Sequence, residues 1–205
     1  MNAELRAALA AATAERAVGT ATVSPASTAE VAAVLRACPT HGARVRVASG
    51  PAPRPAVLPD GVAVLVCLGA LDALAVDSAA GVARAGAGTP LAALRAALDS
   101  SRLTLASPAV PRSPAPSHVG SLVARGGLAR RAVCGVEAVL GTGEVVRAGG
   151  AVQRDVTGFD LIAALLGSEG RLAVVTAVWL RLQPASAAVV PHDAQGPVEP
   201  GVMGD

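Results

Sequence analysis

The sequence contains no lysine and no tyrosine, and it has one phenylalanine, Phe159, and one tryptophan, Trp179. The core must therefore be built from aliphatic side chains, and aromatic platforms on which nucleic-acid bases could stack are almost absent. All 17 basic residues are arginines, but they are scattered along the chain and the net charge is only +2. Binding to a phosphate backbone needs clustered positive charge, so nucleic acid is not expected as a partner.

Cysteine is also scarce. Cys38, Cys67 and Cys134 are widely spaced, odd in number and not arranged as a C-x-x-C motif. This pattern favours buried, reduced thiols over a disulfide framework or a zinc site. A zinc or other metal centre is therefore not expected.

No apolar run is long enough to span a membrane. The first 19 residues carry Glu4 and Glu15 among the alanines, which fits neither a signal peptide nor a membrane span, and the later apolar run over 62–76 is interrupted by Asp72. The sequence therefore predicts a soluble, cytoplasmic protein without a membrane span.

What the chain does contain is a succession of alternating helix and strand signals, which predicts the α+β class. A length of 205 residues is enough for one large domain or two small subdomains with an aliphatic core. Three segments are expected: a helical amino-terminal segment over 1–23, the main domain over 24–183 and a flexible tail over 184–205. The predicted helices cover 3–18, the segment from 28, the segment from 90, 120–125 and about 159–166. The predicted strands cover 43–49, 62–68, 82–85, a hairpin over 133–150, and 172–182.

Two helix starts carry specific signals. Ser27 with Glu30 three residues later has the spacing of a capping box, so a helix is expected to begin near Thr28. Thr89 followed by Pro90 is expected to cap the next helix, with Pro90 in its first position. In the final strand, alternation predicts that one face is shared by Leu172, Val174, Thr176, Val178, Leu180 and Leu182.

Several segments in this order resemble the FAD-binding domain of FAD-linked oxidases, the vanillyl-alcohol oxidase and p-cresol methylhydroxylase group. The most specific match is "DVTGFDLIAALLGSEGRLAVVT" (155–176), followed by "GAGTPLAALRAAL", and the resemblance covers about residues 24–183. Within the group, the chain is most similar to the flavin subunits of glycolate oxidase and D-lactate dehydrogenase. A flavin subunit of a molybdenum hydroxylase would share the domain but matches in less detail.

The resemblance implies two α+β subdomains with an extended FAD between them, held noncovalently with backbone amides on its pyrophosphate. It implies a FAD-binding module of a flavin-dependent oxidoreductase that oxidises a 2-hydroxy acid. The substrate-cap domain of such enzymes is not found after the final strand, so a substrate-domain or electron-transfer subunit is expected as a partner, and no catalytic residue is assigned. The implied cofactor-binding residues are Ser49, Gly50, Ser117, His118, Gly120, Ser121, Gly167, Glu169, Gly170, Val174 and Val175.

The chain also departs from the family pattern. Pro51 and Pro53 stand in the expected pyrophosphate loop, where each removes an N–H donor, and Ala52 stands near where some members attach flavin through histidine. The segment between "ARGG" and "CGVEAVL" is shorter than expected. These departures favour an alternative, a degenerate and flavin-free homologue that acts as an interaction or structural subunit.

Few side chains suggest acid–base chemistry. Asp160, near a helix start, and Glu169, in a turn, are interpreted as partners of caps and helix dipoles rather than as acid–base groups. His118 either faces a ligand or is exposed to solvent, and His41 and His192 belong to no recognisable motif.

Overall fold

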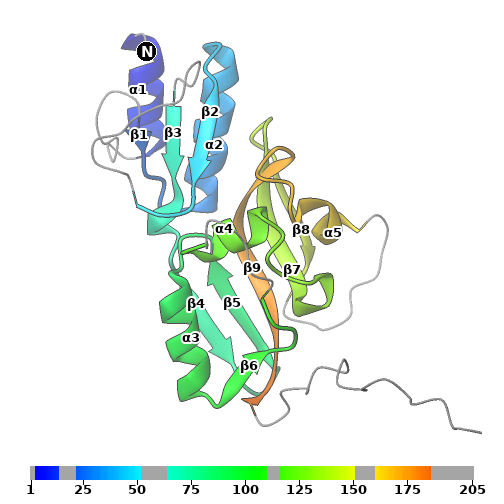
Figure 1. Ribbon diagram of the computed structural model, residues 1–205. Coiled ribbons are helices and arrows are strands. Elements are labelled where there is room, and N and C mark those ends of the chain that lie inside the picture. Colours follow the sequence, from blue (N-terminus) through cyan, green and yellow to red (C-terminus); the bar gives the residue numbers. More distant parts are fainter. Residues whose placement is uncertain (1–2, 14–21, 52–63, 110–115, 151–159, 186–205) are drawn as a thin grey trace, which may run out of the picture.

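The computed structural model describes residues 3–13, 22–51, 64–109, 116–150 and 160–185. These residues form two units, each with its own sheet and helices, so the predicted α+β class is confirmed. The smaller unit contains the amino-terminal elements. Helix α4 (Val119–Ala124) of the larger unit lies near the junction of the two units (Figure 1).

The smaller unit is built on a parallel sheet of three strands: β1 (Thr22–Val23), β2 (Val45–Ala48) and β3 (Val64–Cys67). Strand β3 lies in the middle, and every one of its residues is buried, as expected for a continuous apolar run. The helices α1 (Ala3–Ala12) and α2 (Thr28–Thr40) add Leu5, Leu9 and Val31 to the same core. The short helix η1 (Leu68–Ala70) then leads to the larger unit.

The start of α2 is capped as its sequence predicts. The side chain of Ser27 accepts a hydrogen bond from the backbone N–H of Glu30 at 3.2 Å. In return, the carboxylate of Glu30 accepts from the backbone N–H of Ala26 at 2.9 Å. Both bonds satisfy N–H groups at the helix start, which fixes the point where α2 begins.

The larger unit is built on an antiparallel sheet in the order β4-β5-β9-β7-β8, and β6 pairs with another part of β9. The strands are β4 (Leu74–Asp77), β5 (Val82–Gly86), β6 (Leu103–Leu105), β7 (Val133–Leu140), β8 (Val145–Gly149) and β9 (Ala173–Pro184). The helices are α3 (Leu91–Ser100), α4, η2 (Arg130–Ala132) and α5 (Leu161–Leu165). Leucines and isoleucine of α3, α4 and α5 pack with Ala85, Val178 and Leu180 in one core. The β7–β8 hairpin with its Gly-Thr-Gly turn confirms the prediction for 133–150.

The predicted common face of the last strand is wrong at its amino-terminal end. Val178, Leu180 and Leu182 belong to the core of the larger unit, but Val174 belongs to the core of the smaller unit, and Leu172 precedes the strand with 57% of its surface exposed. In the pairing of β7 with β9, Glu137 lies opposite Ala177, and the next residue of β7, Ala138, lies opposite Val175. Thr176 therefore has no residue of β7 opposite it and is an extra residue in β9. Such a bulge reverses the alternation of side chains, which lets one strand contribute to both cores.

The predicted cap of α3 is displaced by one residue. Pro90 is the N-cap, the helix begins at Leu91, and the hydroxyl of Thr89 donates to the carbonyl of Asp72 at 3.2 Å instead of capping the helix. The predicted helix over 3–18 is observed as α1, followed by a turn at Thr13. Predictions for the loop from Ala52 onward, for the continuation beyond Thr13, for Phe159 and for the tail with His192 lie outside the described residues.

Candidate functional site

A groove of about 1180 Å³ lies where the two units meet. It is bounded by the edge strand β2 and the residues after it, by both ends of α4, and by the turn before β9 (Figure 1). Its lining residues are Val45, Arg46, Val47, Ala48, Ser49, Gly50, Ser117, His118, Ser121, Ala124, Arg125, Glu169, Gly170 and Arg171.

The segment after β2 is in close contact with α4. A Cβ atom on Gly120 would lie 2.7 Å from the Oγ atom of Ser49 and 2.9 Å from the carbonyl oxygen of Ala87, so only glycine allows this approach. The N–H of Gly120 also donates to that carbonyl at 2.8 Å. Gly120 is therefore a packing residue beneath the groove, and it is not part of the groove lining.

The start of α4 is fixed by reciprocal hydrogen bonds that place His118 in the groove. The hydroxyl of Ser121 accepts from the backbone N–H of His118 at 3.3 Å and donates to the carbonyl of His118 at 2.7 Å. The ring Nδ1 of His118 lies 2.8 Å from the hydroxyl of Ser117. The partly buried imidazole packs on Gly50, because a Cβ atom there would lie 2.8 Å from the ring Cε1.

The Gly-Ser-Glu-Gly turn closes the other side of the groove. Gly167, Glu169 and Gly170 all have positive φ angles, of 78°, 54° and 75°. The N–H of Gly167 donates to the carbonyl of Val123 at 3.0 Å, and the N–H of Glu169 donates to that of Ala124 at 2.8 Å. The two glycines therefore allow a tight turn that docks on the end of α4 and brings Glu169, Gly170 and Arg171 into the groove lining.

Positive charge prevails around the groove. Arg46 on β2, Arg125 at the end of α4 and Arg171 after the turn are all exposed, and Glu169 is the one carboxylate among the described lining residues. The guanidinium Nη2 of Arg171 lies 3.3 Å from the carboxylate of Glu169. The charged lining residues therefore sum to +2, a charge that attracts an anion.

The groove brings together most, but not all, of the residues implied by the resemblance. Seven of them line it: Ser49, Gly50, Ser117, His118, Ser121, Glu169 and Gly170. Gly167 does not line the groove, but its N–H docks the turn on the carbonyl of Val123. Val174 lies in the core of the smaller unit, and Val175 is packed against the core of the larger unit. The three arginines were not identified from the sequence, because each belongs to a different segment and has no local motif.

Two acidic residues have structural partners elsewhere. Asp160 caps α5 by accepting from the N–H of Ala163 at 3.0 Å, as predicted, and pairs with Arg130 at 2.7 Å. The hydrogen bond from Arg130 holds the pKa of Asp160 below its ordinary value. Glu137 is buried on β7, where burial acts to raise its pKa, but hydrogen bonds from Thr28 and Arg147 outweigh that effect and hold the pKa below its ordinary value.

Metal and thiol chemistry find no support in the described part of the chain. No group of three or more potential metal ligands occurs among the described residues. Cys38, Cys67 and Cys134 are free cysteines, and all three are buried, as predicted. Burial raises the pKa of all three thiols, that of Cys38 to about 11.

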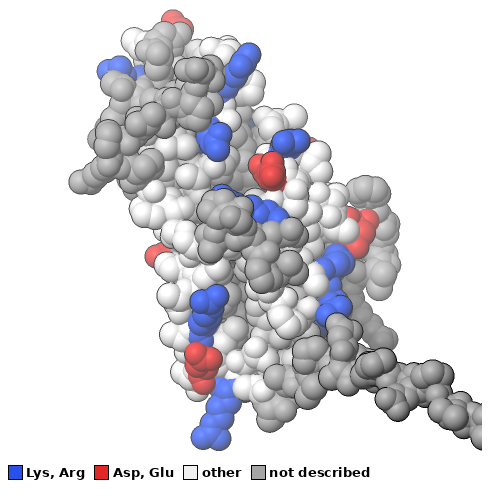
Figure 2. All heavy atoms as spheres, viewed as in Figure 1, with Lys and Arg blue, Asp and Glu red and all other residues white. Residues whose placement is uncertain are grey.

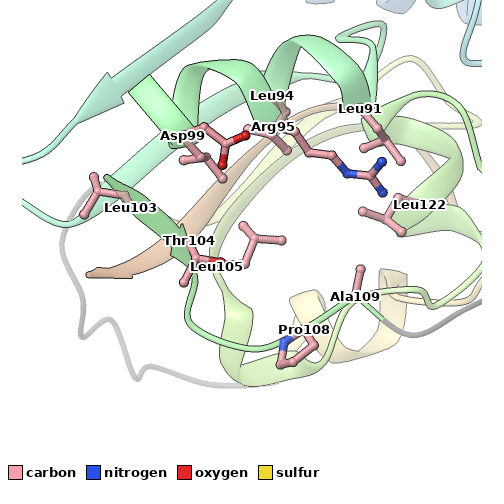
Figure 3. Close-up of a pocket in the computed structure, with 11 residues that line it drawn as sticks. Leu91, Leu94, Arg95, Asp99, Leu103, Thr104, Leu105, Pro108, Ala109 and Leu122 are labelled. Carbon is pink, nitrogen blue, oxygen red and sulfur yellow. The ribbon is translucent and has the colours of Figure 1, made fainter. Parts of the chain in front are cut away.

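A second pocket, of about 310 Å³, lies between α3, β6 and Leu122 of α4 (Figure 3). Leucines dominate its wall, and Arg95 and Asp99 of α3 stand at its border. It lacks the glycine-rich backbone and the excess positive charge of the groove. The larger groove is therefore the better candidate for a polar, anionic ligand.

The charges on the visible face of the molecule are dispersed. In Figure 2, basic and acidic side chains are scattered over the visible face and do not gather in one broad patch of a single sign. None of the helices in the described residues is long and apolar enough to cross a membrane.

Comparison with known proteins identifies the family. The sequence profile described as FAD binding domain matches residues 19–149. An uncharacterized FAD-linked oxidoreductase of Mycobacterium tuberculosis is 50% identical over 58 residues, which cover 28% of this chain and 13% of the relative. The glycolate oxidase subunit GlcD of Bacillus subtilis is 43% identical over 58 residues, covering 28% of this chain and 12% of the subunit. The mitochondrial D-lactate dehydrogenase (cytochrome) of Arabidopsis thaliana is 41% identical over 64 residues, which cover 31% of this chain and 11% of the dehydrogenase.

Solved structures share the fold. The grass pollen allergen Phl p 4, which has glucose dehydrogenase activity, superposes with a TM-score of 0.63 at 22% identity, covering 80% of this chain and 35% of the allergen. A variant of berberine bridge enzyme superposes with a TM-score of 0.65 at 20% identity, covering 80% of this chain and 34% of the enzyme. The chain thus spans about a third of these structures, and its matches span 11–13% of the curated relatives named above.

The profile match extends over more than half of the 205 residues, and the curated relatives include an FAD-linked oxidoreductase. The chain therefore belongs to the FAD binding domain family.

Proposed function

We propose that the groove binds FAD noncovalently and that the chain is the FAD-binding module of an oxidoreductase acting on a 2-hydroxy acid. The observation that carries the proposal is the convergence of Ser49–Gly50, Ser117–Ser121 and Glu169–Gly170 on one groove from three distant parts of the chain. The family resemblance assigns cofactor contacts to these three segments.

The groove fits the chemistry of a dinucleotide. Gly170 presents backbone without a side chain, and the hydroxyls of Ser117 and Ser121 can exchange hydrogen bonds with a polar ligand. The excess positive charge complements a diphosphate. No cysteine lies among the described lining residues, and by the family resemblance Ala52 stands near the position where some members attach flavin through histidine, which favours noncovalent binding.

Bound FAD would supply the hydride chemistry, while the chain would bind and orient the cofactor. The 2-hydroxy acid class is suggested by the relatives named glycolate oxidase and D-lactate dehydrogenase. Because the matches cover only a small part of those relatives, we propose that a substrate domain or an electron-transfer subunit from outside the described residues completes the site.

One observation favours the alternative, a flavin-free subunit with an interaction role. Pro51 follows Gly50 directly and has no N–H to donate, so the groove has one backbone donor fewer where the diphosphate is expected.

A flavin titration separates the two functions. The purified full chain is titrated with FAD, and binding is followed by quenching of flavin fluorescence and by the absorbance of flavin retained after gel filtration. Saturable binding is the expected result. If no binding occurs at high micromolar FAD, the chain is a flavin-free subunit. Glycolate and D-lactate are then tested as reductants of the bound flavin, and bleaching by either one would support the substrate class.

A further inference from the structure

We infer that Arg46, Arg125 and Arg171 form a clamp that holds a diphosphate through guanidinium groups, compensating for donors that the loop after β2 lacks. The inference rests on the proposed function and assigns the phosphate contacts of that same groove. The three arginines are called the arginine clamp below.

The backbone near Gly50 is poorly suited to cradle a diphosphate by itself. Pro51 and Pro53 have no N–H groups, so two of the positions directly after Gly50 cannot donate a hydrogen bond. The imidazole of His118 also covers Gly50 on the side where a Cβ atom would project. An anion in this groove therefore needs donors from other elements.

The arginine clamp supplies such donors from three directions. Arg46 lies on the edge strand β2, in register with Leu65 of β3, so its position is fixed by the smaller sheet. Arg125 is the C-cap of α4, and its backbone N–H donates to the carbonyl of Ser121 at 3.2 Å. Regular structure thus holds both backbones, and both residues line the groove.

The third member is positioned by the turn. The N–H of Arg171 donates to the carbonyl of Ser168 at 3.0 Å, and its guanidinium pairs with Glu169. Glu169 has a left-handed backbone conformation although it is not a glycine. This conformation costs free energy and persists only where the surrounding structure fixes it. The turn thereby directs Arg171 toward the same groove as the other two arginines.

The charge balance matches a diphosphate. Three guanidinium groups and the carboxylate of Glu169 leave +2 among the described lining residues, which would neutralise a diphosphate bridge with two negative charges. Guanidinium groups bind phosphate oxygens through paired, charge-assisted hydrogen bonds, and they do so without a glycine-rich backbone. Because all three arginines are exposed, salt should weaken the contribution of each one.

The test compares ligands with and without phosphate. FAD, ADP and riboflavin are titrated into the wild-type chain and into Arg46→Gln, Arg125→Gln, Arg171→Gln and triple variants, with FAD and riboflavin followed by fluorescence and ADP by calorimetry. We expect each single change to weaken FAD and ADP about threefold and the triple change at least about twentyfold, because exposed charge-assisted contacts are individually modest. Riboflavin, which has no phosphate, should bind equally to all variants.

Arg95→Gln is the matched control, because Arg95 is an exposed arginine on α3 that borders the other pocket. It should leave FAD and ADP binding unchanged. Circular dichroism should show the same melting curve for the triple variant, since none of the three side chains is buried.

The possible results separate the clamp from the proposed function. If wild type binds FAD and the triple variant binds it equally well, the clamp is wrong and the FAD site stands. If wild type binds ADP in a manner that depends on the arginines but does not bind FAD, the clamp is supported and the FAD function is wrong. If neither ligand binds to wild type, both are wrong.

Discussion

The hydroxyl of Thr28, at the start of α2, donates a hydrogen bond to the buried carboxylate of Glu137 on β7. Thr28 belongs to the smaller unit and Glu137 to the larger one. The same carboxylate accepts from Arg147 of β8 at 2.6 Å and lies 3.3 Å from the hydroxyl of Thr176, the extra residue of the β9 bulge. A single side chain with 4% exposure thus connects both units at the point where β9 passes between their cores.

Removing the charge of Glu137 should destabilise the fold. Glu137→Gln retains the size of the side chain but loses the ion pair with Arg147, and we expect a loss of about 1–3 kcal/mol in the free energy of unfolding. Urea denaturation followed by circular dichroism measures it. The control is Glu144→Gln, an exposed carboxylate on the adjoining turn, which should change stability by less than about 0.5 kcal/mol. Equal effects of the two changes would contradict the role assigned to the buried carboxylate.

The same carboxylate should make stability depend on pH. The pKa of Glu137 in the folded chain lies below its ordinary value of 4.5, so the unfolded chain binds the proton first as the pH falls. The stabilisation is therefore complete above 4.5 and is lost as the pH falls toward the folded pKa. The difference in unfolding free energy between wild type and Glu137→Gln should be largest above pH 4.5 and should shrink as the pH falls below that value. Asp160, whose pKa is lowered too, is present in both proteins and cancels in this difference. A difference that stays constant or grows would show that Glu137 is not held in its charged form.

Local signals in the sequence predicted the elements well, because they depend on neighbouring residues. Ser27 and Glu30 both act at the start of α2, and the Gly-Thr-Gly turn produces the β7–β8 hairpin. The bulge at Thr176 could not be predicted, because it depends on how β9 pairs with β7, a strand almost forty residues away. Alternation alone therefore predicted a common face for Val174 and Val178, whereas the two residues belong to different cores.

The site was predictable only where its residues carry a family motif. The glycines and serines of the groove stand in recognisable turns, so the resemblance located them. Arg46 instead alternates with valines in a strand, a pattern that indicates an exposed face, and the sequence does not show that it meets Arg125 and Arg171. Glu137 stands among apolar residues of β7, and its partners come from three other elements. Charged sites assembled from distant segments become visible only in the folded chain.

The three thiols should be unreactive in the native protein. Burial raises the pKa of each one, and a thiol that stays protonated is a poor nucleophile. An aromatic disulfide reagent at neutral pH should label native protein slowly and should titrate 3 thiols per chain after unfolding in guanidinium chloride. Cys134, 8% exposed against 0% for Cys38 and Cys67, should react first in the native state, as peptide mapping can show. Labelling of native Cys38 as fast as free cysteine would contradict its placement in the core.

Gly170 allows a cofactor contact to be separated from backbone strain. It has a φ of +75° with no atom within 4 Å of the Cβ position, and Gly42, in the turn between α2 and β2, has a φ of +63° and equally open surroundings. Alanine at either position should cost about 1–2 kcal/mol of stability, because L-residues disfavour the left-handed region. Only Gly170 lines the groove, so Gly170→Ala should also weaken FAD binding, whereas Gly42→Ala should leave the dissociation constant for FAD unchanged. Fluorescence titration at a temperature well below both melting points measures that constant without interference from unfolding. If both variants lose stability and bind FAD alike, the Gly-Ser-Glu-Gly turn serves the fold and does not contact the cofactor.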